Sequence, residues 1–343
     1  MDPDSERVVR ERLLPLFREA ARLNAALTID MEQYAFKDLT LEIFRSLLEG
    51  SEFSRAPHAA IALQAYLRDA ERDMGELIQW ARTKRRRIGV RLVKGAYWDS
   101  EIAWAKQKGW PIQVFLDKGE TDANYEKLTK LLLENHDIVD AAFGSHNLRS
   151  LAYAIVTAEQ LGVPKHGYEV QMLYGMGEPV RQAMIQNGQR VRVYLPVGQL
   201  LPGMAYLIRR LMENTSNTSF LRQTYADAAD VNKLIAAPAP KKPAQKLPPS
   251  AREGFQAEVA GPFHNEPLLD FSQRENCAEF AQTLNEIRRK FGDTYPLWIA
   301  GKEVETRNKL VSVNPSAPQE IVGQVSVAGE KEAERALFAA AKF

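Results

Sequence analysis

The stretch at residues 88–93, IGVRLV, is apolar on both faces apart from one arginine, Arg91. Strands that are apolar on both faces are typical of parallel sheets covered by helices. Similar short apolar runs recur along the first two-thirds of the chain, and amphipathic helical stretches separate them. This alternation predicts parallel βαβ units. We expect strands at residues 26–29, 60–63, 88–93, 112–116, 140–143, 168–173 and 191–195. The helical patterns between them include residues 124–134, 148–161 and 178–187.

The spacing of these strands, roughly 23–34 residues, is typical of a (β/α)8 barrel. Seven parallel strands do not close such a barrel, and residues 5–23 have the pattern of a helix with no strand before it. We therefore expect an α/β fold, an N-terminally truncated TIM-type barrel whose first strand lies outside the chain. A doubly wound open sheet is the competing architecture, and it needs no missing strand.

The composition changes after the expected barrel. The chain has 343 residues, 45% of them hydrophobic, which is enough apolar material for one large core and part of a second. Residues 1–233 have the barrel pattern, and residues 234–270 form a linker rich in proline and lysine. Residues 271–343 have the pattern of the start of a second α/β domain. Its expected helices are 278–291 and 331–342, and its expected strands are 297–300 and 322–327.

Charge and cysteine content narrow the function classes. The formal net charge of +1 does not favour a nucleic-acid partner. We interpret the basic run at residues 84–87 as a solvated helix end. The single cysteine, Cys277, supports neither a disulfide framework nor a cysteine-based metal site, and it fits a reducing cytoplasm. No apolar run approaches the roughly 18 residues of a membrane-spanning helix, and the acidic N-terminus is unlike a signal peptide.

Polar side chains stand at the ends of the expected strands, where barrel enzymes carry their chemistry. One such residue alone would be interpreted as a helix cap or a hydrogen-bonded core group, but several together indicate a site. They are Asp30, Gln64, Arg91, His146, Asn147, Gln171 and Tyr194. No second ligand stands at metal-binding spacing from His146, so we expect no metal.

An arginine inside an apolar strand, such as Arg91, is unfavourable unless it is paired. One interpretation is a structural salt bridge to Asp30 or Glu169. The other is a fixed positive charge that faces a cofactor or an anion. Both stay open on the sequence pattern.

Residues 204–214 have the pattern of an amphipathic helix, led by Pro202 and Gly203. The expected packing stripe is Met204, Leu207, Ile208 and Leu211. The opposite face carries Tyr206, Arg209, Arg210 and Glu213. Two adjacent guanidinium groups can hold a carboxylate through charge-assisted hydrogen bonds, whereas an ordinary solvated face is the alternative. Residues 175–180 lack the third glycine of a dinucleotide-binding fingerprint, and no phosphate loop is present.

Several longer motifs then become recognisable. They are RLVKGAYW at 91–98, TDANY at 121–125, SHN at 145–147, YEVQMLYGM at 168–176, YLIRRLMEN at 206–214 and NTSF at 217–220. Together they resemble bacterial proline dehydrogenase, the flavin barrel of the bifunctional proline utilization A (PutA) proteins, over about residues 5–233. The motifs PLWIAGK at 296–302, NP at 314–315 and VG at 322–323 resemble the N-terminal edge of an aldehyde dehydrogenase, here the glutamate-semialdehyde dehydrogenase half.

The resemblance implies FAD held by the barrel and oxidation of L-proline to 1-pyrroline-5-carboxylate. Hydride would pass from the ring carbon next to nitrogen to flavin N5, and the electrons would go to a membrane quinone. It also implies a cytoplasmic protein peripheral to the inner membrane, with a homo-oligomer as a further expectation. NAD would serve only the remainder of the aldehyde dehydrogenase domain, which also holds its thiol nucleophile; Cys277 lies too early to be that thiol.

The resemblance also assigns roles to residues. Arg209 and Arg210 match the pair that holds the proline carboxylate, and Tyr97, Tyr194 and Tyr206 match side chains around the proline ring. Asp30 and Arg91 match the catalytic pair, with Arg91 near flavin N5. The matched FAD contacts are Met31, Gln64, Arg91, Val93, Lys94, Gly95, Ala96, Tyr97, Trp98, Ser145, His146, Asn147, Gln171, Tyr194, Arg210, Glu213, Ser216 and Phe220.

The chain departs from the family pattern in two places. The family's first strand carries an active-site lysine that has no equivalent here, and Leu116-Asp117 replaces a Thr-Arg pair at the flavin edge. Two competing hypotheses follow. The chain is an inactive fragment with an unclosed barrel and exposed strand edges, or it is a barrel lyase or hydrolase for another small carboxylate.

Overall fold

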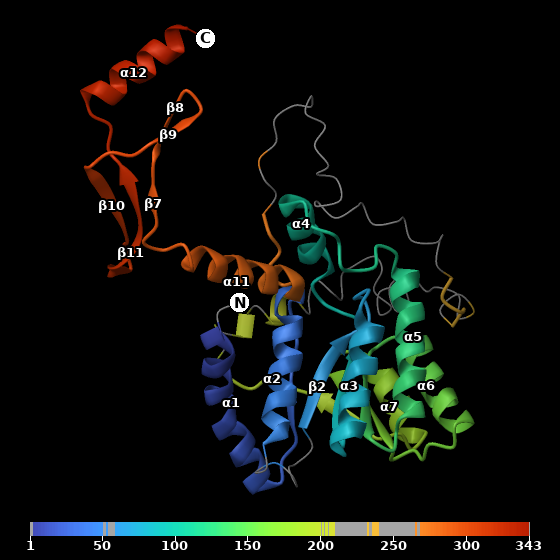
Figure 1. Cartoon of the computed structure of the whole chain (residues 1–343). Helices are drawn as coiled ribbons and strands as arrows, with labels where there is room; N and C mark the ends of the chain where they lie inside the picture. Colours follow the sequence, from blue (N-terminus) through green and yellow to red (C-terminus); the bar gives the residue numbers. More distant parts are fainter. Residues whose placement is uncertain are drawn as a thin grey trace. The chain divides into compact units, whose positions relative to one another are not determined.

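The computed structural model describes residues 3–50, 53, 59–199, 201, 203–204, 206–209, 232, 235–239, 265 and 268–342 (Figure 1). The chain divides into two compact units, residues 1–272 and 273–343. Each unit is described by itself below. The division between the units, at residues 272 and 273, lies close to residue 271, where the second domain was predicted to begin.

The first unit contains a six-stranded sheet in which every neighbouring pair is parallel. Its strands follow the order of the chain: β1 (Leu27–Ile29), β2 (Ala59–Gln64), β3 (Ile88–Val93), β4 (Val139–Gly144), β5 (Tyr168–Leu173) and β6 (Val191–Tyr194). A doubly wound sheet reverses its strand order at a switch point, whereas this sheet winds in one direction, as part of a barrel does. The barrel-type α/β fold is therefore confirmed, and the doubly wound alternative is wrong.

The predicted strand at residues 112–116 is wrong. Val114 forms only an isolated antiparallel bridge with Leu67, and the amide of Phe115 donates to the carbonyl of Tyr66 at 2.8 Å. Val114 is nevertheless fully buried in the hydrophobic core. A short apolar run can be buried in a loop as well as in a strand, and the pattern alone does not separate the two.

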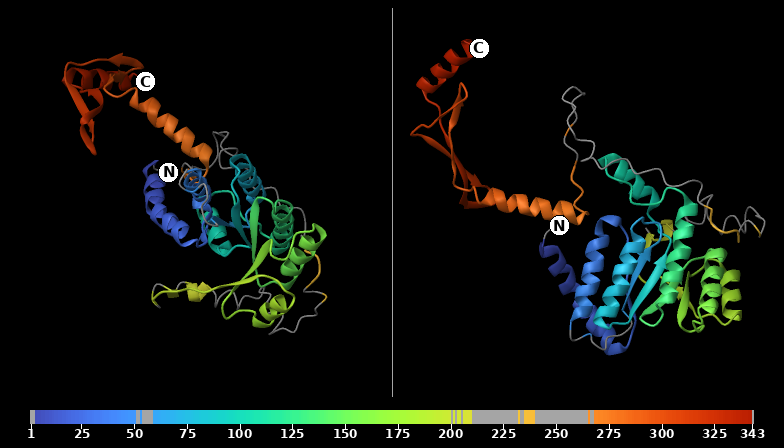
Figure 2. Two further views of the ribbon diagram at one scale, coloured as in Figure 1. Left: turned by 90° about the horizontal axis from the view of Figure 1, so that it is seen from below. Right: turned by 45° about the vertical axis from the view of Figure 1, so that its right-hand side comes forward.

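Helices follow most of the strands, and Figures 1 and 2 show several of them side by side along the sheet. They are α1 (Pro3–Leu23), α2 (Lys37–Glu49), α3 (Ala70–Lys84), α4 (Trp98–Lys108), α5 (Lys118–Glu134), α6 (Leu148–Gln160) and α7 (Glu178–Gln186), with a 3-10 turn, η1, at Tyr34–Phe36. The predicted helices at 5–23, 148–161 and 178–187 are confirmed. Helix α5 begins earlier than predicted, because Asp117 and Glu120 form a capping box at its start.

The two faces of the sheet differ in character. Val90 and Leu92 of β3 are fully buried and belong to the core cluster that includes residues of the covering helices. Side chains alternate between faces along a strand, so Arg91, between them, points to the opposite face. The same alternation on β5 buries Val170 and Met172 and turns Gln171 toward Arg91. The predicted polar site therefore lies on the face away from these helices.

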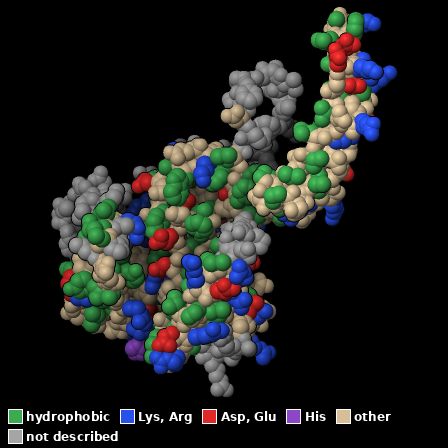
Figure 3. Space-filling view, turned by 90° about the vertical axis from the view of Figure 1, so that its left-hand side faces the viewer, with side chains coloured by type: hydrophobic (Ala, Val, Ile, Leu, Met, Phe, Trp, Pro, Cys, Tyr) green, Lys and Arg blue, Asp and Glu red, His purple; other side chains and the backbone are tan. Residues whose placement is uncertain are grey.

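The basic run at residues 84–87 is more than a solvated helix end. Lys84 pairs with Glu49 at 3.0 Å, and Arg87 pairs with Asp140 at 2.7 Å. Arg86 is partly buried and donates to two backbone carbonyls. On the face shown in Figure 3, lysine and arginine side chains are interspersed with acidic ones. The run therefore forms the end of α3 and bonds to α2, to β4 and to the backbone at residues 50 and 53.

The second unit is built on α11 (Arg274–Arg288), which includes Cys277. A three-stranded sheet follows in the order β10 (Lys309–Asn314), β11 (Ala317–Ser326) and β7 (Thr294–Tyr295), and β8 (Leu297–Ile299) pairs with β9 (Lys302–Val304). Helix α12 (Glu330–Ala341) ends the unit. The predicted helices and strands are confirmed with shifted ends, whereas β10, the antiparallel partner of β11, was not predicted.

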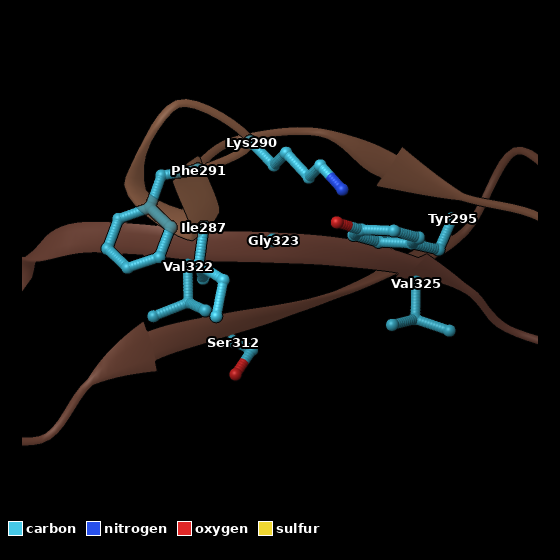
Figure 4. A pocket seen from close by; sticks show the side chains of 8 residues that line it. All are labelled: Ile287, Lys290, Phe291, Tyr295, Ser312, Val322, Gly323 and Val325. Carbon is cyan, nitrogen blue, oxygen red and sulfur yellow. The ribbon is translucent and has the colours of Figure 1, made fainter. Parts of the chain in front are cut away.

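An open apolar hollow of about 300 Å³ lies against this small sheet (Figure 4). It is lined by Ile287, Lys290, Phe291, Tyr295, Ser312, Val322, Gly323 and Val325. Among the described residues of the whole chain, no helix has both the length and the apolar character needed to cross a membrane.

Candidate active site

Arg91 is the centre of the polar site. Its Nη1 donates to Oδ1 of Asp30, and its Nε donates to Oε1 of Gln171 at 2.7 Å. The Arg91 side chain is only 15% exposed, so these bonds replace much of its contact with water. The salt bridge to Asp30 is therefore present. Glu169, the other predicted partner, does not bond Arg91 directly but reaches it through Gln171.

Aromatic rings connect Arg91 to the last predicted helix. The Arg91 guanidinium lies 5.8 Å from the ring centroid of Tyr194, at the end of β6. Tyr194 stacks on Tyr206, with centroids 5.9 Å apart. The Arg209 guanidinium lies 5.7 Å from the ring centroid of Tyr97. Cations within about 6 Å of a ring face are attracted by it. The structure thus brings together the predicted substrate residues that it describes.

Gln64 is buried at the end of β2, with 3% exposure. Its Nε2 donates to the carbonyl oxygens of Met31 and Glu32, at 2.6 and 2.8 Å. Its Oε1 is buried and has no hydrogen-bond partner in the part of the chain that the structure describes. A buried acceptor without a partner is unfavourable. Gln64 therefore offers an oxygen to an N–H group of a bound ligand.

The segment after β3 is held by backbone and side-chain bonds. The carbonyls of Val93 and Lys94 accept from the amides of Ala65 and Tyr66, both at 2.8 Å. The exposed Ala96 follows Gly95 in this loop. Gly95 has φ +130°, a conformation that favours glycine. This loop leads into α4, and it positions the predicted flavin contacts 93–98.

Two side chains anchor the same segment. Nζ of Lys94 pairs with Oδ1 of Asp122 on α5. Burial lowers the pKa of Lys94, although Asp122 beside it favours the charged form. Trp98 donates from Nε1 to the carbonyl of Phe115 at 2.7 Å. Asp122 was not predicted as a site residue, and its place in the TDANY motif is the signal that could have found it.

We expect Gly95→Ala to destabilise the protein by about 3 kcal/mol, through backbone strain and overpacking. A Cβ at Gly95 would lie 2.5 Å from ring carbons of Tyr66, which is 2% exposed. The matched control is Gly75→Ala in α3, where a Cβ meets nothing within 4 Å. That control is expected to stabilise the helix by about 0.5–1 kcal/mol. Thermal unfolding followed by circular dichroism measures both, and equal effects would contradict the expectation.

The SHN motif after β4 has structural roles in this site. Oδ1 of Asn147 accepts from the amide of Ser150 and caps α6, and Oγ of Ser145 accepts from the amide of Asn147. Nε2 of His146 accepts from the amide of Leu173 at 3.0 Å. Nε2 is therefore unprotonated in this arrangement. The helix-cap interpretation holds for Asn147, and His146 ties the end of β4 to the end of β5.

Other predicted residues lie outside the described part of the chain: Arg210, Glu213, Ser216 and Phe220. The second arginine of the carboxylate pair therefore stays a prediction. In the described part, no group of three or more His, Cys, Asp or Glu side chains is arranged to hold a metal ion.

The chain is similar to one known protein family over most of its first unit. The family model for proline dehydrogenase matches residues 2–223. The chain belongs to the proline dehydrogenase family. Its PutA-type character is supported by the crystal structure of PutA from Bdellovibrio bacteriovorus inactivated by N-propargylglycine, which is 41% identical with a TM-score of 0.87. That alignment covers 97% of this chain and 34% of the other.

Two curated relatives extend the comparison. The bifunctional protein PutA of Escherichia coli is 31% identical over 354 residues, which cover 98% of this chain and 26% of that protein. The 1-pyrroline-5-carboxylate dehydrogenase of Bacillus pumilus is 49% identical over 81 residues, 24% of this chain and 16% of that protein. The chain therefore spans about a third or less of the length of these relatives.

Proposed function

We propose that this chain carries most of the active site of an FAD-dependent proline dehydrogenase, which oxidises L-proline to 1-pyrroline-5-carboxylate. The observation that carries the proposal is the cluster of Arg91, Asp30, Tyr194, Tyr206 and Arg209. Asp30 and Tyr194 of this cluster lie at the carboxyl ends of the parallel strands β1 and β6, where barrel enzymes perform their chemistry, in a chain of the proline dehydrogenase family.

The residues present suit a flavin. The buried Oε1 of Gln64, without a partner among the described residues, fits the imide N–H donor of an isoalloxazine ring. Arg91 on β3 and Lys94 just after it bring positive charge to the same end of the sheet, each paired with an aspartate. The residues that would hold FAD are Met31, Gln64, residues 93–98, residues 145–147, Gln171 and Tyr194, together with Arg210, Glu213, Ser216 and Phe220 from outside the described part. When bound, FAD would accept the hydride, which carries both electrons of the oxidation.

The chain's own residues bind and orient proline. In the proposed reaction Arg209, with Arg210, holds the carboxylate, and Tyr97, Tyr194 and Tyr206 enclose the ring. The ring carbon next to nitrogen loses a hydride and the nitrogen loses a proton, so that a C=N bond forms. Arg91, held by Asp30, provides fixed positive charge where negative charge develops on the acceptor.

The proposal extends to the longer protein. Residues 1–233 form the proline dehydrogenase part, residues 234–270 the linker, and residues 271–343 the start of an NAD-dependent glutamate-semialdehyde dehydrogenase domain. The similarity to a 1-pyrroline-5-carboxylate dehydrogenase over 81 residues supports the last assignment. We further propose a quinone acceptor, peripheral association of the cytoplasmic protein with the inner membrane, and a homo-oligomer.

An absorbance spectrum of the purified full-length protein tests whether it binds a flavin that proline reduces. We expect a band near about 450 nm, as flavins show, that bleaches on addition of proline and recovers with an electron-accepting dye. Turnover of a small carboxylate without flavin or acceptor would instead support a lyase or hydrolase. The same measurement on the 343-residue chain alone tests the inactive-fragment hypothesis, which expects neither flavin nor turnover from that chain.

A further inference from the structure

Glu169 is a buried carboxylate to which the proposed reaction assigns no role. It lies on β5 two residues before Gln171, is 5% exposed, and shares the inner face of the sheet with it. Its Oε1 accepts from Nε2 of Gln171 at 2.6 Å. Gln171 in turn accepts from Nε of Arg91. Glu169 is therefore connected to the central arginine by one amide.

The carboxylate itself is held on its other side by two arginines of β6 and the loop before it. Arg192 binds it in a bidentate manner, with Nε to Oε1 at 2.8 Å and Nη2 to Oε2 at 2.9 Å. Arg190 donates from Nε and Nη2 to Oε2, at 3.1 and 2.9 Å. Burial alone would raise the pKa of Glu169, but the hydrogen bonds from Arg192, Gln171 and Arg190 outweigh it and lower the pKa. The group is thus a fixed anion.

The amide of Gln171 has only one orientation that satisfies both neighbours. An ionised carboxylate only accepts hydrogen bonds, and a guanidinium only donates them. The NH2 group of Gln171 must therefore face Glu169, and its oxygen must face Arg91. A neutral amide at position 169 would remove the constraint from that side, because an amide can either donate or accept, and would leave Arg91 alone to orient Gln171.

The hydrogen bond from Arg91 on β3 to Gln171 on β5 passes over β4, which carries small residues at this point. Strand β4 lies between β3 and β5, and its residues on the inner face are Ala142 and Gly144. A Cβ at Gly144 would lie 2.9 Å from Cγ1 of Val93 and 3.8 Å from Cγ of Arg91. The small residues leave the space through which the Arg91 side chain reaches Gln171, two strands away.

We propose that Glu169 is a positioning residue for Arg91, which it orients through the amide of Gln171. The inference rests on the proposed function, because Arg91 is the proposed charge beside the flavin. Glu169 touches neither substrate nor cofactor in this assignment. It keeps the Arg91 guanidinium in one plane, with Nε toward Gln171 and Nη1 toward Asp30.

A double-mutant cycle in the full-length FAD-loaded protein tests this. Glu169→Gln is expected to lower kcat for proline about 10-fold, the size of one hydrogen bond to a charged group. It is also expected to shift the flavin midpoint potential to more negative values, because the positive charge is no longer held in place. In the Arg91→Met background, the same substitution is expected to change kcat less than about twofold and to leave the potential unchanged.

The matched control is Asp140→Asn on β4, which breaks the ion pair with Arg87 but lies outside this connection. It is expected to leave kcat and the potential unchanged. An equal loss from Glu169→Gln in both backgrounds, or an unshifted potential, would show that Glu169 only anchors the strands. If Glu169→Gln fails to fold, Glu169→Asp replaces it. The charge stays, but the carboxylate moves back by about 1.5 Å, one C–C bond. The change in kcat in the two backgrounds and the flavin potential then decide between the two roles in the same way.

Failure of the inference is distinguishable from failure of the proposed function. A wild-type protein without flavin or proline oxidation would overturn the function. A wild-type protein that oxidises proline, with additive effects of the two substitutions, would overturn only the role of Glu169.

Discussion

Arg91→Met is expected to lower kcat for proline oxidation by about 10²–10³-fold, the range observed when one preorganised donor to a developing charge is removed. Arg91 is mostly buried and held by Asp30 and Gln171, so its charge is fixed before the reaction starts. A fixed charge stabilises the negative charge gained by the hydride acceptor without reorganisation. Methionine matches much of the arginine's length but carries no charge.

Rapid-mixing measurement of flavin bleaching at saturating proline reports this step directly. The control is Arg87→Met, because Arg87 stands just before the same strand and is 45% exposed in its pair with Asp140. It is expected to leave the rate within about twofold of wild type, since exposed ion pairs contribute little. A change under threefold in Arg91→Met, with FAD still bound, would rule out the proposed electrostatic role.

The second large effect is expected from Arg209→Ala, as a rise in KM for proline. Removing one partner of a hydrogen-bonded charge pair costs about 2–5 kcal/mol, which corresponds to between about 30-fold and several thousand-fold. Arg209 lies over the ring of Tyr97, which keeps its guanidinium in the aromatic part of the site. Alanine removes both the charge and this contact.

Prolinamide, which lacks the carboxylate, separates these two contributions. Wild-type protein is expected to prefer proline to prolinamide, and Arg209→Ala is expected to lose most of that preference. Arg72→Ala is the control, because Arg72 is 61% exposed and pairs with carboxylates at the start of its own helix, Asp69 at the N-cap and Asp73. An unchanged preference in Arg209→Ala would contradict the carboxylate role, even if KM rises.

The fold was largely predictable because its strands are short apolar runs and its helices are amphipathic. The exception, residues 112–116, is instructive. Val114 is as deeply buried as a strand residue, so its apolar pattern was interpreted correctly as core and incorrectly as sheet. An apolar pattern reports that side chains are buried, whereas a strand also needs backbone hydrogen bonds to a neighbouring strand.

The sequence named candidate site residues but did not indicate the contacts among them. Asn147 proved to cap α6, the interpretation that applies to an isolated polar residue at a strand end. The salt bridge of Arg91 to Asp30 was one of two open interpretations, and the structure shows that pair. The other interpretation, a fixed charge that faces a cofactor or an anion, stays a prediction. The predicted contact with Glu169 required an intervening Gln171.

Alternation, spacing and capping depend on residues within a few positions of each other, so the order of strands and helices and the face on which Arg91 stands were already contained in the chain's local pattern. Only the folded chain decided which side chains meet. Arg91 and Gln171 are 80 positions apart, and they bond because the strand between them carries Ala142 and Gly144 at the right register. The register of the strands depends on the packing of the whole sheet against its helices, so no short stretch of sequence determines it.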